Sequence, residues 1–479
     1  MNTHLLQTRL EDYAAAAPYP LHMPGHKRRV NPAPGLPAAW DVTEVPGVDD
    51  LHEAQGILAD AMNRAAALWG AQRSWFLVNG STGGILAAIR AAALTRPGRP
   101  IVCARNCHKS VYHAIELNAL AVEWMTPPVD PAFGVYGSVT PAQAAAALDR
   151  CPGAAALVLT SPTYEGVLSD VAAIAALCHD RDVPLIVDEA HGAHYLPLAQ
   201  PFGWQGGAVA AGADLVIQSP HKTLPSLTQT ALLHQNGGRI PAAAVERQLD
   251  VFETSSPSYP LLASLDGCAG LLAAHGTQWF AAWRERLDRF DRAVAPLRRL
   301  RVLCHGTDAA KSHPGIFRHD GGKLLVSGAG AGWTGAALAD RLRRDGFETE
   351  MACGANVLAM TSPCDAEDAL DRLAAALLAV DAASAAPAAP LPPPLPEPGA
   401  AACPIAEAVR RPAVTLPLAQ AAGRVAAEYL WAYPPGVPLI APGERIPAGF
   451  AAAAAALESS GTRLRHTGAT LPDQISVLA

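Results

Sequence analysis

The sequence predicts an α/β protein with a mostly parallel sheet that is covered by helices on both faces. Two observations predict this fold class. Short β-branched runs alternate with Ala-rich stretches of helical length, and 479 residues with 50% hydrophobic side chains suffice for two or three domains with cores. Repeated strand, helix, strand order makes the strands parallel. The predicted strands are 75–79, 101–103, 155–160, 184–188 and 214–217.

Changes in composition along the chain predict its domains. Residues 256–381 are richer in helical patterns and include a charged run at 283–292, most simply the solvated face of a helix. Residues 382–400 are rich in Pro and Ala, which cannot form a core and favour an extended linker. The predicted order is an N-terminal arm (1–50), a large α/β domain (51–255), a smaller α+β domain (256–381), the linker (382–400) and a C-terminal α+β domain (401–479).

Charge and cysteine content exclude several classes of protein. The formal net charge is -7, with 36 basic and 43 acidic residues and no basic stripe, so nucleic acid is not an expected partner. No run reaches the roughly 18 apolar residues of a membrane span, and the N-terminus has no long apolar stretch. Nine scattered cysteines fit reduced thiols. We therefore expect a cytoplasmic protein without membrane contacts.

A glycine-rich turn at 79–84, Asn-Gly-Ser-Thr-Gly-Gly, follows the first predicted strand and begins a helix. Glycines such as Gly83 let the backbone approach a ligand, and the free amides of a helix start, with the Ser81 and Thr82 hydroxyls, suit a phosphate. An ordinary helix N-cap is the alternative for this turn taken alone. No GxxxxGK[ST] loop occurs in the chain.

The segment Asp-Glu-Ala-His at 188–191 ends another predicted strand. It is like the metal-binding box of helicases, but the chain has no phosphate loop or basic groove to accompany it, so we reject a helicase. His191 with His194, and His22 with His26, have spacings found in metal sites but no convincing third ligand, so no metal is expected. Asp188 is instead suited to hold a positively charged ring nitrogen.

A single lysine, Lys222, ends the predicted strand 214–217 within Gln-Ser-Pro-His-Lys-Thr. An amine at the mouth of a packed sheet is costly to desolvate, so it is either a snorkelling surface residue or one kept for its chemistry. Strand-end lysine, strand-end Asp188 and the phosphate turn together describe a site for pyridoxal phosphate, in which the lysine binds the cofactor covalently.

Motifs along the whole chain are similar to those of the bacterial ornithine/lysine/arginine decarboxylases, pyridoxal phosphate enzymes of the aspartate aminotransferase fold (fold type I). This resemblance implies a fold type I large domain and the same cofactor. The motifs are Met-Pro-Gly-His-Lys (23–27), the Asp-Val-Thr-Glu segment (41–52), the turn at 79–82, Ala-Arg-Asn-Cys-His-Lys-Ser (104–110), 187–194, 218–222, 254–259, 423–428, 433–436 and 442–444.

The resemblance also implies a role for each site residue. Lys222 carries the cofactor, Asp188 binds its ring nitrogen and His108 stacks on the ring. His191 is a further ring or carboxylate contact, or a structural histidine. Lys222 or His221 donates the proton to the substrate's α-carbon, and the segment from Thr254 to Tyr259 completes the site across a dimer interface. The residues implied around the phosphate are Ser81, Thr82, Gly83, Ser219 and His221.

The implied activity is decarboxylation of a basic amino acid to an amine and CO2, which feeds polyamine metabolism. Arginine ranks first, lysine second and ornithine third. A transaminase or aldolase of the same fold, and a cofactor-binding interaction protein without turnover, are the alternatives. The substrate's distal cation needs a carboxylate or aromatic partner, for which Glu350 and Glu444 are candidates, each weighed against an ordinary surface glutamate.

Two departures from the family pattern affect these expectations. Arg28 and Arg29 stand where relatives have glycines, so the local backbone and the active-site entrance should differ. The cofactor-domain motifs begin within about 25 residues of Met1, without the receiver-like N-terminal wing of the long members. Because that wing builds large rings in relatives, we expect a homodimer or homotetramer here.

Overall fold

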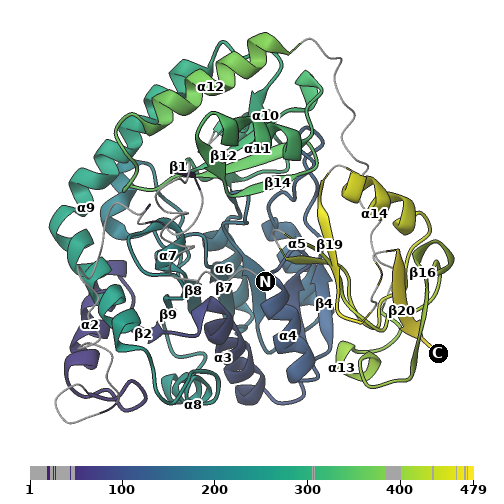
Figure 1. Cartoon of the computed structure of the whole chain (residues 1–479). Coiled ribbons are helices and arrows are strands. Elements are labelled where there is room, and N and C mark those ends of the chain that lie inside the picture. Colours follow the sequence, from purple (N-terminus) through teal and green to yellow (C-terminus); the bar gives the residue numbers. More distant parts are fainter. Residues whose placement is uncertain are drawn as a thin grey trace, which may run out of the picture.

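The computed structural model describes most of the chain in three bodies that pack on one another (Figure 1). The N-terminal arm and the linker predicted above lie almost wholly outside the described residues, as do Arg28 and Arg29. The described residues are 19–21, 25, 27, 44, 49–304, 306, 308–384, 401–433, 436–459, 461–468, 471 and 473–479.

A seven-stranded sheet forms the centre of the large body and has the strand order β2-β9-β8-β7-β5-β3-β4. Of these seven strands, β9 runs antiparallel to β2 and β8, and the pairs among β8, β7, β5, β3 and β4 are parallel. The mostly parallel sheet predicted above is therefore present. The strands are β2 (Arg73–Leu77), β3 (Ile101–Ala104), β4 (Val122–Met125), β5 (Leu157–Thr160), β7 (Leu185–Glu189), β8 (Leu215–Gln218) and β9 (Ala231–Gln235).

Each of the five predicted strands overlaps an observed one, whereas β4 and β9 were missed. Strand β4 has the sequence Val-Glu-Trp-Met at the edge of the sheet, and β9 has Ala-Leu-Leu-His-Gln. Neither is a β-branched run. His234 and Gln235 are nevertheless buried, because the Nδ1 of His234 lies 2.7 Å from Ser74 Oγ and Gln235 donates to the Ile240 carbonyl. Buried polar side chains that form hydrogen bonds inside the core are therefore the reason why the sequence did not reveal β9.

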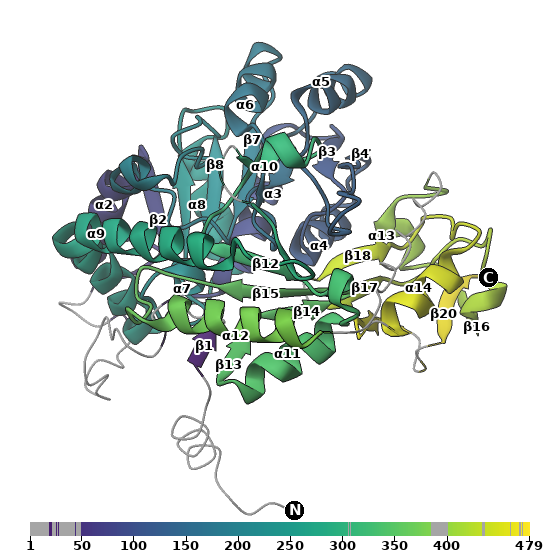
Figure 2. The ribbon, with the colours of Figure 1, turned by 90° about the horizontal axis from the view of Figure 1, so that it is seen from above.

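Helices cover both faces of this sheet. In Figure 1, α3, α4 and α8 lie in front of the sheet, and Figure 2 shows α5 and α6 on its opposite side. Capping side chains fix several of the starts: Thr140 and Gln143 form a capping box on α5, and Asp170 caps α6. The helices are α2 (Ile57–Trp69), α3 (Gly80–Thr95), α4 (Lys109–Leu117), α5 (Pro141–Arg150), α6 (Val171–Asp180), α7 (Pro220–Thr223) and α8 (Ala242–Phe252).

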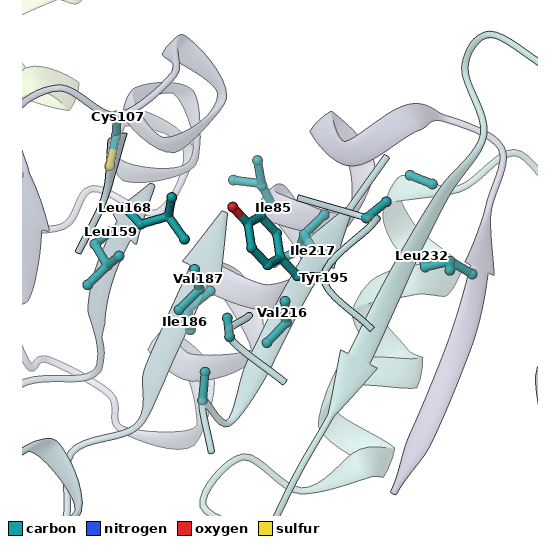
Figure 3. Close-up of a cluster of buried hydrophobic side chains, with 14 of the residues drawn as sticks. Ile85, Cys107, Leu159, Leu168, Ile186, Val187, Tyr195, Val216, Ile217 and Leu232 are labelled. Atoms are coloured by element: carbon teal, nitrogen blue, oxygen red, sulfur yellow. The ribbon is translucent and has the colours of Figure 1, made fainter. Parts of the chain in front are cut away.

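Buried aliphatic side chains of β7 and β8 fill the middle of the large body (Figure 3). Val187 and Ile217 are buried on these strands, and Ile85 of α3 packs in the same cluster, with Tyr195 among the strand side chains in the close-up. Burial of each such side chain contributes about 1.5–3 kcal/mol. The core therefore fixes the two strands whose ends carry Asp188 and Lys222.

The second body is a four-stranded antiparallel sheet, β10-β12-β15-β14, with helices beside it (Figure 2). Its long helix α9 contains the charged run at 283–292. Trp283, Leu287 and Phe290 of this run are buried on one side of the helix, whereas its charged residues other than Arg286 are partly or fully exposed. The elements are α9 (Tyr259–Val294), β10 (Arg301–Val302), α10 (Asp308–Ser312), β12 (Lys323–Ser327), α11 (Gly335–Arg344), β14 (Met351–Cys353), β15 (Asn356–Met360) and α12 (Ala369–Ala383).

Two short strand pairs join these bodies. Strand β1 (Tyr19–Leu21) pairs in parallel with β13 (Phe347–Thr349), which ties the start of the described chain to the second body. Strand β6 (Val167–Leu168) of the large body pairs antiparallel with β11 (Arg318–His319) of the second.

The third body, at the C-terminus, has its own small core around Phe450, Ile440 and Val477. A buried ion pair fastens it to the large body: Arg105 Nη2 lies 2.9 Å from Glu444 Oε2. Its elements are α13 (Ile405–Ala408), β16 (Ala413–Pro417), β17 (Leu430–Tyr433), β18 (Val437–Ile440), α14 (Phe450–Ser459), β19 (Arg463–His466) and β20 (Gln474–Leu478), with β16 paired to β20 and β17 between β18 and β19.

Gly25 of the Pro-Gly-His-Lys motif touches the backbone of α7, which carries Lys222. The Gly25 amide donates to the His221 carbonyl at 2.6 Å, and Ser362 Oγ donates to the Gly25 carbonyl. A Cβ at position 25 would lie 2.2 Å from the Leu224 nitrogen and 2.3 Å from the Thr223 carbonyl carbon. Only glycine fits this approach without moving α7.

We expect Gly25→Ala to lower the free energy of unfolding by about 1–3 kcal/mol, because the added methyl group must displace backbone atoms. Denaturant unfolding measures the change. Gly270→Ala is the matched control, since Gly270 is an exposed residue of α9 where a Cβ meets nothing within 4 Å, and it should be neutral or slightly stabilising. Equal stability of Gly25→Ala and the parent protein would contradict the proposed close fit.

Candidate active site

A cavity of about 820 Å³ lies where the three bodies meet. This is ample room for a cofactor and a small substrate. The cavity takes residues from strand ends and loops of the large body, from β14 and from the C-terminal body. Residues that line it include Ser81, Asn106, His108, Thr160, Tyr164, Glu165, Asp188, His191, Lys222, Glu350, Cys353, Leu439, Leu457 and Thr462.

Lys222 reaches this cavity from the short helix α7, directly after β8. Its Nζ lies 3.0 Å from the Nε2 atom of His191. Burial lowers the pKa of the Lys222 amine, and the nearby carboxylates of Asp188 and Glu350 oppose that shift. A lowered pKa raises the fraction of neutral amine, which is the nucleophilic form.

Asp188 lies beside this lysine because β7 and β8 are paired in register, with Asp188 opposite Ile217. It is 3% exposed and accepts a hydrogen bond from the Ala190 amide at 3.1 Å. Burial raises the pKa of Asp188, and the positive charge of Lys222 opposes the rise. A carboxylate in this position is stabilised by any further cation that enters the cavity.

His108 is the N-cap residue of α4, and contacts with Ser110 in the first turn of that helix hold its ring. Its Nδ1 atom accepts a hydrogen bond from the Ser110 amide and lies 2.8 Å from Ser110 Oγ. Burial and the charge of Lys222 lower the pKa of His108 to about 3. The ring is therefore neutral at physiological pH and lines the cavity, as a stacking partner requires.

The remaining predicted residues fall into two groups. Ser81 lines the cavity. Ser219, three residues before Lys222, has a buried Oγ without a hydrogen-bond partner. Thr82, Gly83 and His221 do not line it. Thr82 is exposed, and a Cβ on Gly83 would lie 2.6 Å from Glu253 Oε1, so Gly83 serves the close packing of α3.

His221 donates from Nδ1 to the Thr230 carbonyl at 2.7 Å. His191, in contrast, is 6% exposed and lies at the centre of the site, with its ring 4.7 Å from the ring of Tyr164. The structure thus brings Ser81, His108, Asp188, His191 and Lys222 together around one cavity.

The two glutamates proposed for the substrate's distal cation are placed very differently. Glu350, between β13 and β14, lines the cavity and accepts a short hydrogen bond from the Tyr164 hydroxyl. Glu444 is 4% exposed, does not line the cavity and is held by Arg105 and by the Ala441 amide. Burial raises the pKa of Glu444, and Arg105 opposes this rise. The geometry therefore favours Glu350 over Glu444 as the candidate partner of the substrate's distal cation.

Three residues of the site were missed from the sequence: Tyr164, Glu165 and Lys323. The first two follow β5 in Thr-Ser-Pro-Thr-Tyr-Glu-Gly at 160–166, a polar segment at a parallel strand end that could have been noted. Lys323, the first residue of β12, is 2% exposed and lies 2.7 Å from His191 Nδ1. A lone lysine in an apolar strand of another domain gave no local signal.

Two family models match the chain. Orn/Lys/Arg decarboxylase, major domain, matches residues 5–302, and Orn/Lys/Arg decarboxylase, C-terminal domain, matches residues 390–460. The chain belongs to the Orn/Lys/Arg decarboxylase family. The resemblance inferred from its motifs is therefore confirmed.

Two arginine decarboxylases are similar to this decarboxylase over almost its whole length, and a lysine decarboxylase is similar over half of it. The arginine decarboxylase of Bacillus subtilis (strain 168) is 32% identical over 458 residues, which cover 92% of this chain and 91% of that protein. The arginine decarboxylase of Bacillus anthracis is 31% identical over 457 residues, 92% of this chain and 90% of that one. The constitutive lysine decarboxylase of Escherichia coli (strain K12) is 29% identical over 253 residues, 50% of this chain and 34% of that one.

Solved structures confirm the predicted fold. The lysine decarboxylase of Francisella novicida superposes with a TM-score of 0.74 at 18% identity, covering 92% of this chain and 74% of that one. The serine palmitoyltransferase of Sphingomonas wittichii superposes with a TM-score of 0.52 at 14% identity, covering 68% of this chain and 76% of that one. The decarboxylase therefore has the fold type I architecture of pyridoxal phosphate enzymes.

Pyridoxal phosphate is the cofactor of this family, and the residues around the cavity fit it. Ser219 Oγ is buried without a hydrogen-bond partner, as a donor to an anionic or polar group would be. The start of α3 adds free backbone amides beside Ser81.

Among the described residues, no three His, Cys, Asp or Glu side chains gather to hold a metal ion. Among the described helices, none has both the length and the hydropathy for crossing a membrane.

We expect Lys222→Ala to abolish the covalent attachment of pyridoxal phosphate, because it removes the amine that lines the cavity. Borohydride reduction followed by intact-mass spectrometry measures the adduct. Lys311→Ala is the matched control, since Lys311 is exposed and paired with Asp308. An adduct of unchanged yield in Lys222→Ala would place the attachment at another lysine.

Proposed function

We propose that this decarboxylase removes the α-carboxyl group of arginine, with lysine and ornithine as second and third candidates, and that its amine product feeds polyamine metabolism in the cytoplasm. One observation carries the choice of a basic substrate. Glu165 and Glu350 line the same cavity as Lys222, so a substrate whose amino group reaches the lysine can direct a distal cation to these carboxylates.

The aromatic side chains beside Glu165 and Glu350 favour arginine over lysine as the substrate. Tyr164 adds an aromatic ring next to the two carboxylates, and Phe133 and Tyr136 line the cavity as well. A guanidinium is planar, forms bidentate bonds with carboxylates and stacks on aromatic faces, whereas an ammonium ion is a compact point charge. Two relatives that match 92% of this chain are named arginine decarboxylase, which supports the same choice.

The chain's own residues have defined tasks in this reaction. When bound, the cofactor supplies an electron sink for the electron pair that remains after CO2 departs. Asp188 stabilises positive charge on the ring nitrogen, and neutral His108 provides a flat, uncharged surface. Lys222 is the better candidate to deliver the proton to the substrate's α-carbon, because it lines the cavity while His221 does not.

Burial raises the pKa of Glu165, which lines the cavity close to Lys323. A substrate cation at this wall would restore the ionised carboxylate, because an opposite charge favours the charged form of an acid. Recognition of the cation and ionisation of Glu165 are thereby coupled, and a neutral side chain in the substrate would leave Glu165 without this additional cation.

We also propose that a second copy completes the site with its segment from Thr254 to Tyr259. The segment starts directly after Glu253, whose Oε2 accepts hydrogen bonds from the Val78 and Asn79 amides just before the phosphate turn. Residues 254–256 are exposed, although Glu253 directly before them contacts the start of the phosphate turn. A dimer across this surface would cover them.

We expect Glu350→Gln to raise KM for arginine by about ten- to a hundredfold with a smaller change in kcat, because loss of a charge-assisted bond costs about 1.5–3 kcal/mol. Steady-state kinetics with product detection by mass spectrometry measure both constants. Glu407→Gln is the matched control, as Glu407 is exposed on α13 and lies 3.6 Å from Arg411.

The same assay with arginine, lysine and ornithine tests the proposed function itself. Amine formed from arginine at the highest kcat/KM supports it, and no amine from any of the three contradicts it. If Glu350→Gln and Glu165→Gln both keep the parental KM for the preferred substrate, the distal cation is bound elsewhere.

For the second copy, we expect Ser256→Arg to shift the protein toward monomer and to weaken cofactor retention, since a bulky cation would enter the proposed interface. Sedimentation velocity and the absorbance of retained cofactor measure the two effects. Ala142→Arg, on the exposed side of α5, is the control. A monomeric Ser256→Arg protein that retains its full cofactor would show that each chain builds its site alone.

A further inference from the structure

Lys323 lies behind the cavity wall and has no role in the reaction described so far. Its Nζ lies 2.7 Å from the Nδ1 atom of His191, and the Nε2 atom of the same ring lies 3.0 Å from Nζ of Lys222. One imidazole therefore joins two lysines, one from the second body and one from the large body.

Hydrogen-bond chemistry limits the charge of this group of three. A neutral imidazole has one N–H donor and one acceptor nitrogen, and an ammonium ion has no lone pair. The lysine that accepts the ring N–H must therefore be a neutral amine. Burial, followed by Lys222 and Lys323, lowers the pKa of His191 well below its usual range, so the ring itself is neutral. Together the two lysines carry at most one positive charge.

We infer that Lys222, His191 and Lys323 form a proton relay, in which Lys323 takes up and returns the proton that Lys222 loses and regains during the reaction proposed above. In the outward direction, the Lys222 ammonium gives a proton to Nε2 while the Nδ1 proton passes to the lone pair of Lys323. Lys222 ends as a neutral amine, Lys323 as an ammonium ion, and the ring has changed tautomer. The reverse transfer recharges Lys222 for proton delivery to the α-carbon.

The surroundings of Lys323 suit a group that changes charge. Burial lowers the pKa of Lys323 to about 7, opposed by Asp320 and Glu350, while Lys222 lowers it further. Three acids, Asp320, Glu350 and Glu165, thus stabilise its charged form, and burial stabilises its neutral form. The charged and titratable groups that face the three members of the relay are Asp320, Glu165, Glu350, Asp188, His108, His221 and, through its ring, Tyr164.

Packing holds the relay in place. The Tyr164 ring lies 4.7 Å from the His191 ring and 5.8 Å from the Lys323 ammonium. Gly166 passes so close that a Cβ there would lie 2.7 Å from Lys323 Cβ. The base of the lysine stem and the imidazole therefore have little freedom, which keeps the two hydrogen bonds aligned.

The use of lysine itself is a second, independent observation. Of 36 Lys and Arg residues in the chain, only five are lysines, at positions 27, 109, 222, 311 and 323. A guanidinium supplies charge and hydrogen bonds but does not release its proton in proteins, whereas a buried lysine does. Two of these five lysines stand at the ends of the relay, in a chain whose other 31 Lys and Arg residues are all arginine.

The first test is a pH titration of the cofactor-free full-length protein labelled with 15N at the lysine Nζ atoms. Five lysines give five signals, which single Lys→Arg variants assign. We expect either Lys222 or Lys323 to lose its proton at least about one pH unit below the other, and one of the two to be neutral by pH 8. Two charged amines at pH 8 would overturn the relay.

Variants of Lys323 separate a relay from a structural role. Lys323→Met removes a like charge and the proton acceptor, so the titration midpoint of Lys222 should rise by about one pH unit, a tenfold loss of neutral amine at a given pH. Lys323→Arg places a permanent donor on Nδ1 and keeps the charge, so the midpoint should fall. Opposite shifts support the relay, and an unmoved midpoint in both folded variants contradicts it.

Lys311→Met, at an exposed lysine, is the control and should leave the Lys222 midpoint unchanged. If neither Lys323 variant folds, the titration of the unaltered protein decides alone. No substrate is present in these measurements, so a wrong assignment of the preferred amino acid would leave their outcome unaffected.

Discussion

The pairing of β7 with β8 is the constraint on which the whole site depends. Their parallel register sets Asp188 opposite Ile217 and Glu189 opposite Gln218, so the chain leaves both strands at the same edge of the sheet. From that edge β7 continues into Ala190 and His191, and β8 into Ser219 and α7. Ser219 donates its amide to the Ala190 carbonyl at 3.3 Å, which extends the contact beyond the strands. The acid and the imidazole, three residues apart on the path out of β7, thus meet an amine that lies 31 residues from the imidazole in sequence.

Much of this arrangement could be predicted because its parts are local. Strand ends, the Gly-rich turn and the lysine of α7 each carry a short-range signal, and parallel order places them at one edge. Glu350 could be proposed but not chosen over Glu444, since nothing in either local sequence shows which carboxylate reaches the cavity. Only tertiary contacts distinguish them: Glu444 meets Arg105, 339 residues away, and Glu350 meets Tyr164, 186 residues away.

The C-terminal body is part of the site, because Leu439, Leu457 and Thr462 line the cavity. Thr462 Oγ1 lies 3.2 Å from Cys353 Sγ and also accepts a hydrogen bond from the Gly354 amide, so it contacts the second body at the cavity edge. Arg105 holds the other side through Glu444 and the Pro438 carbonyl. A buried ion pair contributes less to stability than to a defined orientation, and here it orients one wall of the cavity.

Glu253 connects the start of the phosphate turn with the exposed residues 254–256. Its carboxylate receives the Val78 and Asn79 amides at the approach to the phosphate turn, and its backbone leads directly into the exposed residues 254–256. Burial raises the pKa of Glu253 to about 7, and the two amide hydrogen bonds oppose that rise. With a second copy docked on 254–259 as proposed, cofactor occupancy and subunit association become linked equilibria, each strengthening the other. Dilution of the protein would then release cofactor, and added cofactor would hold the subunits together.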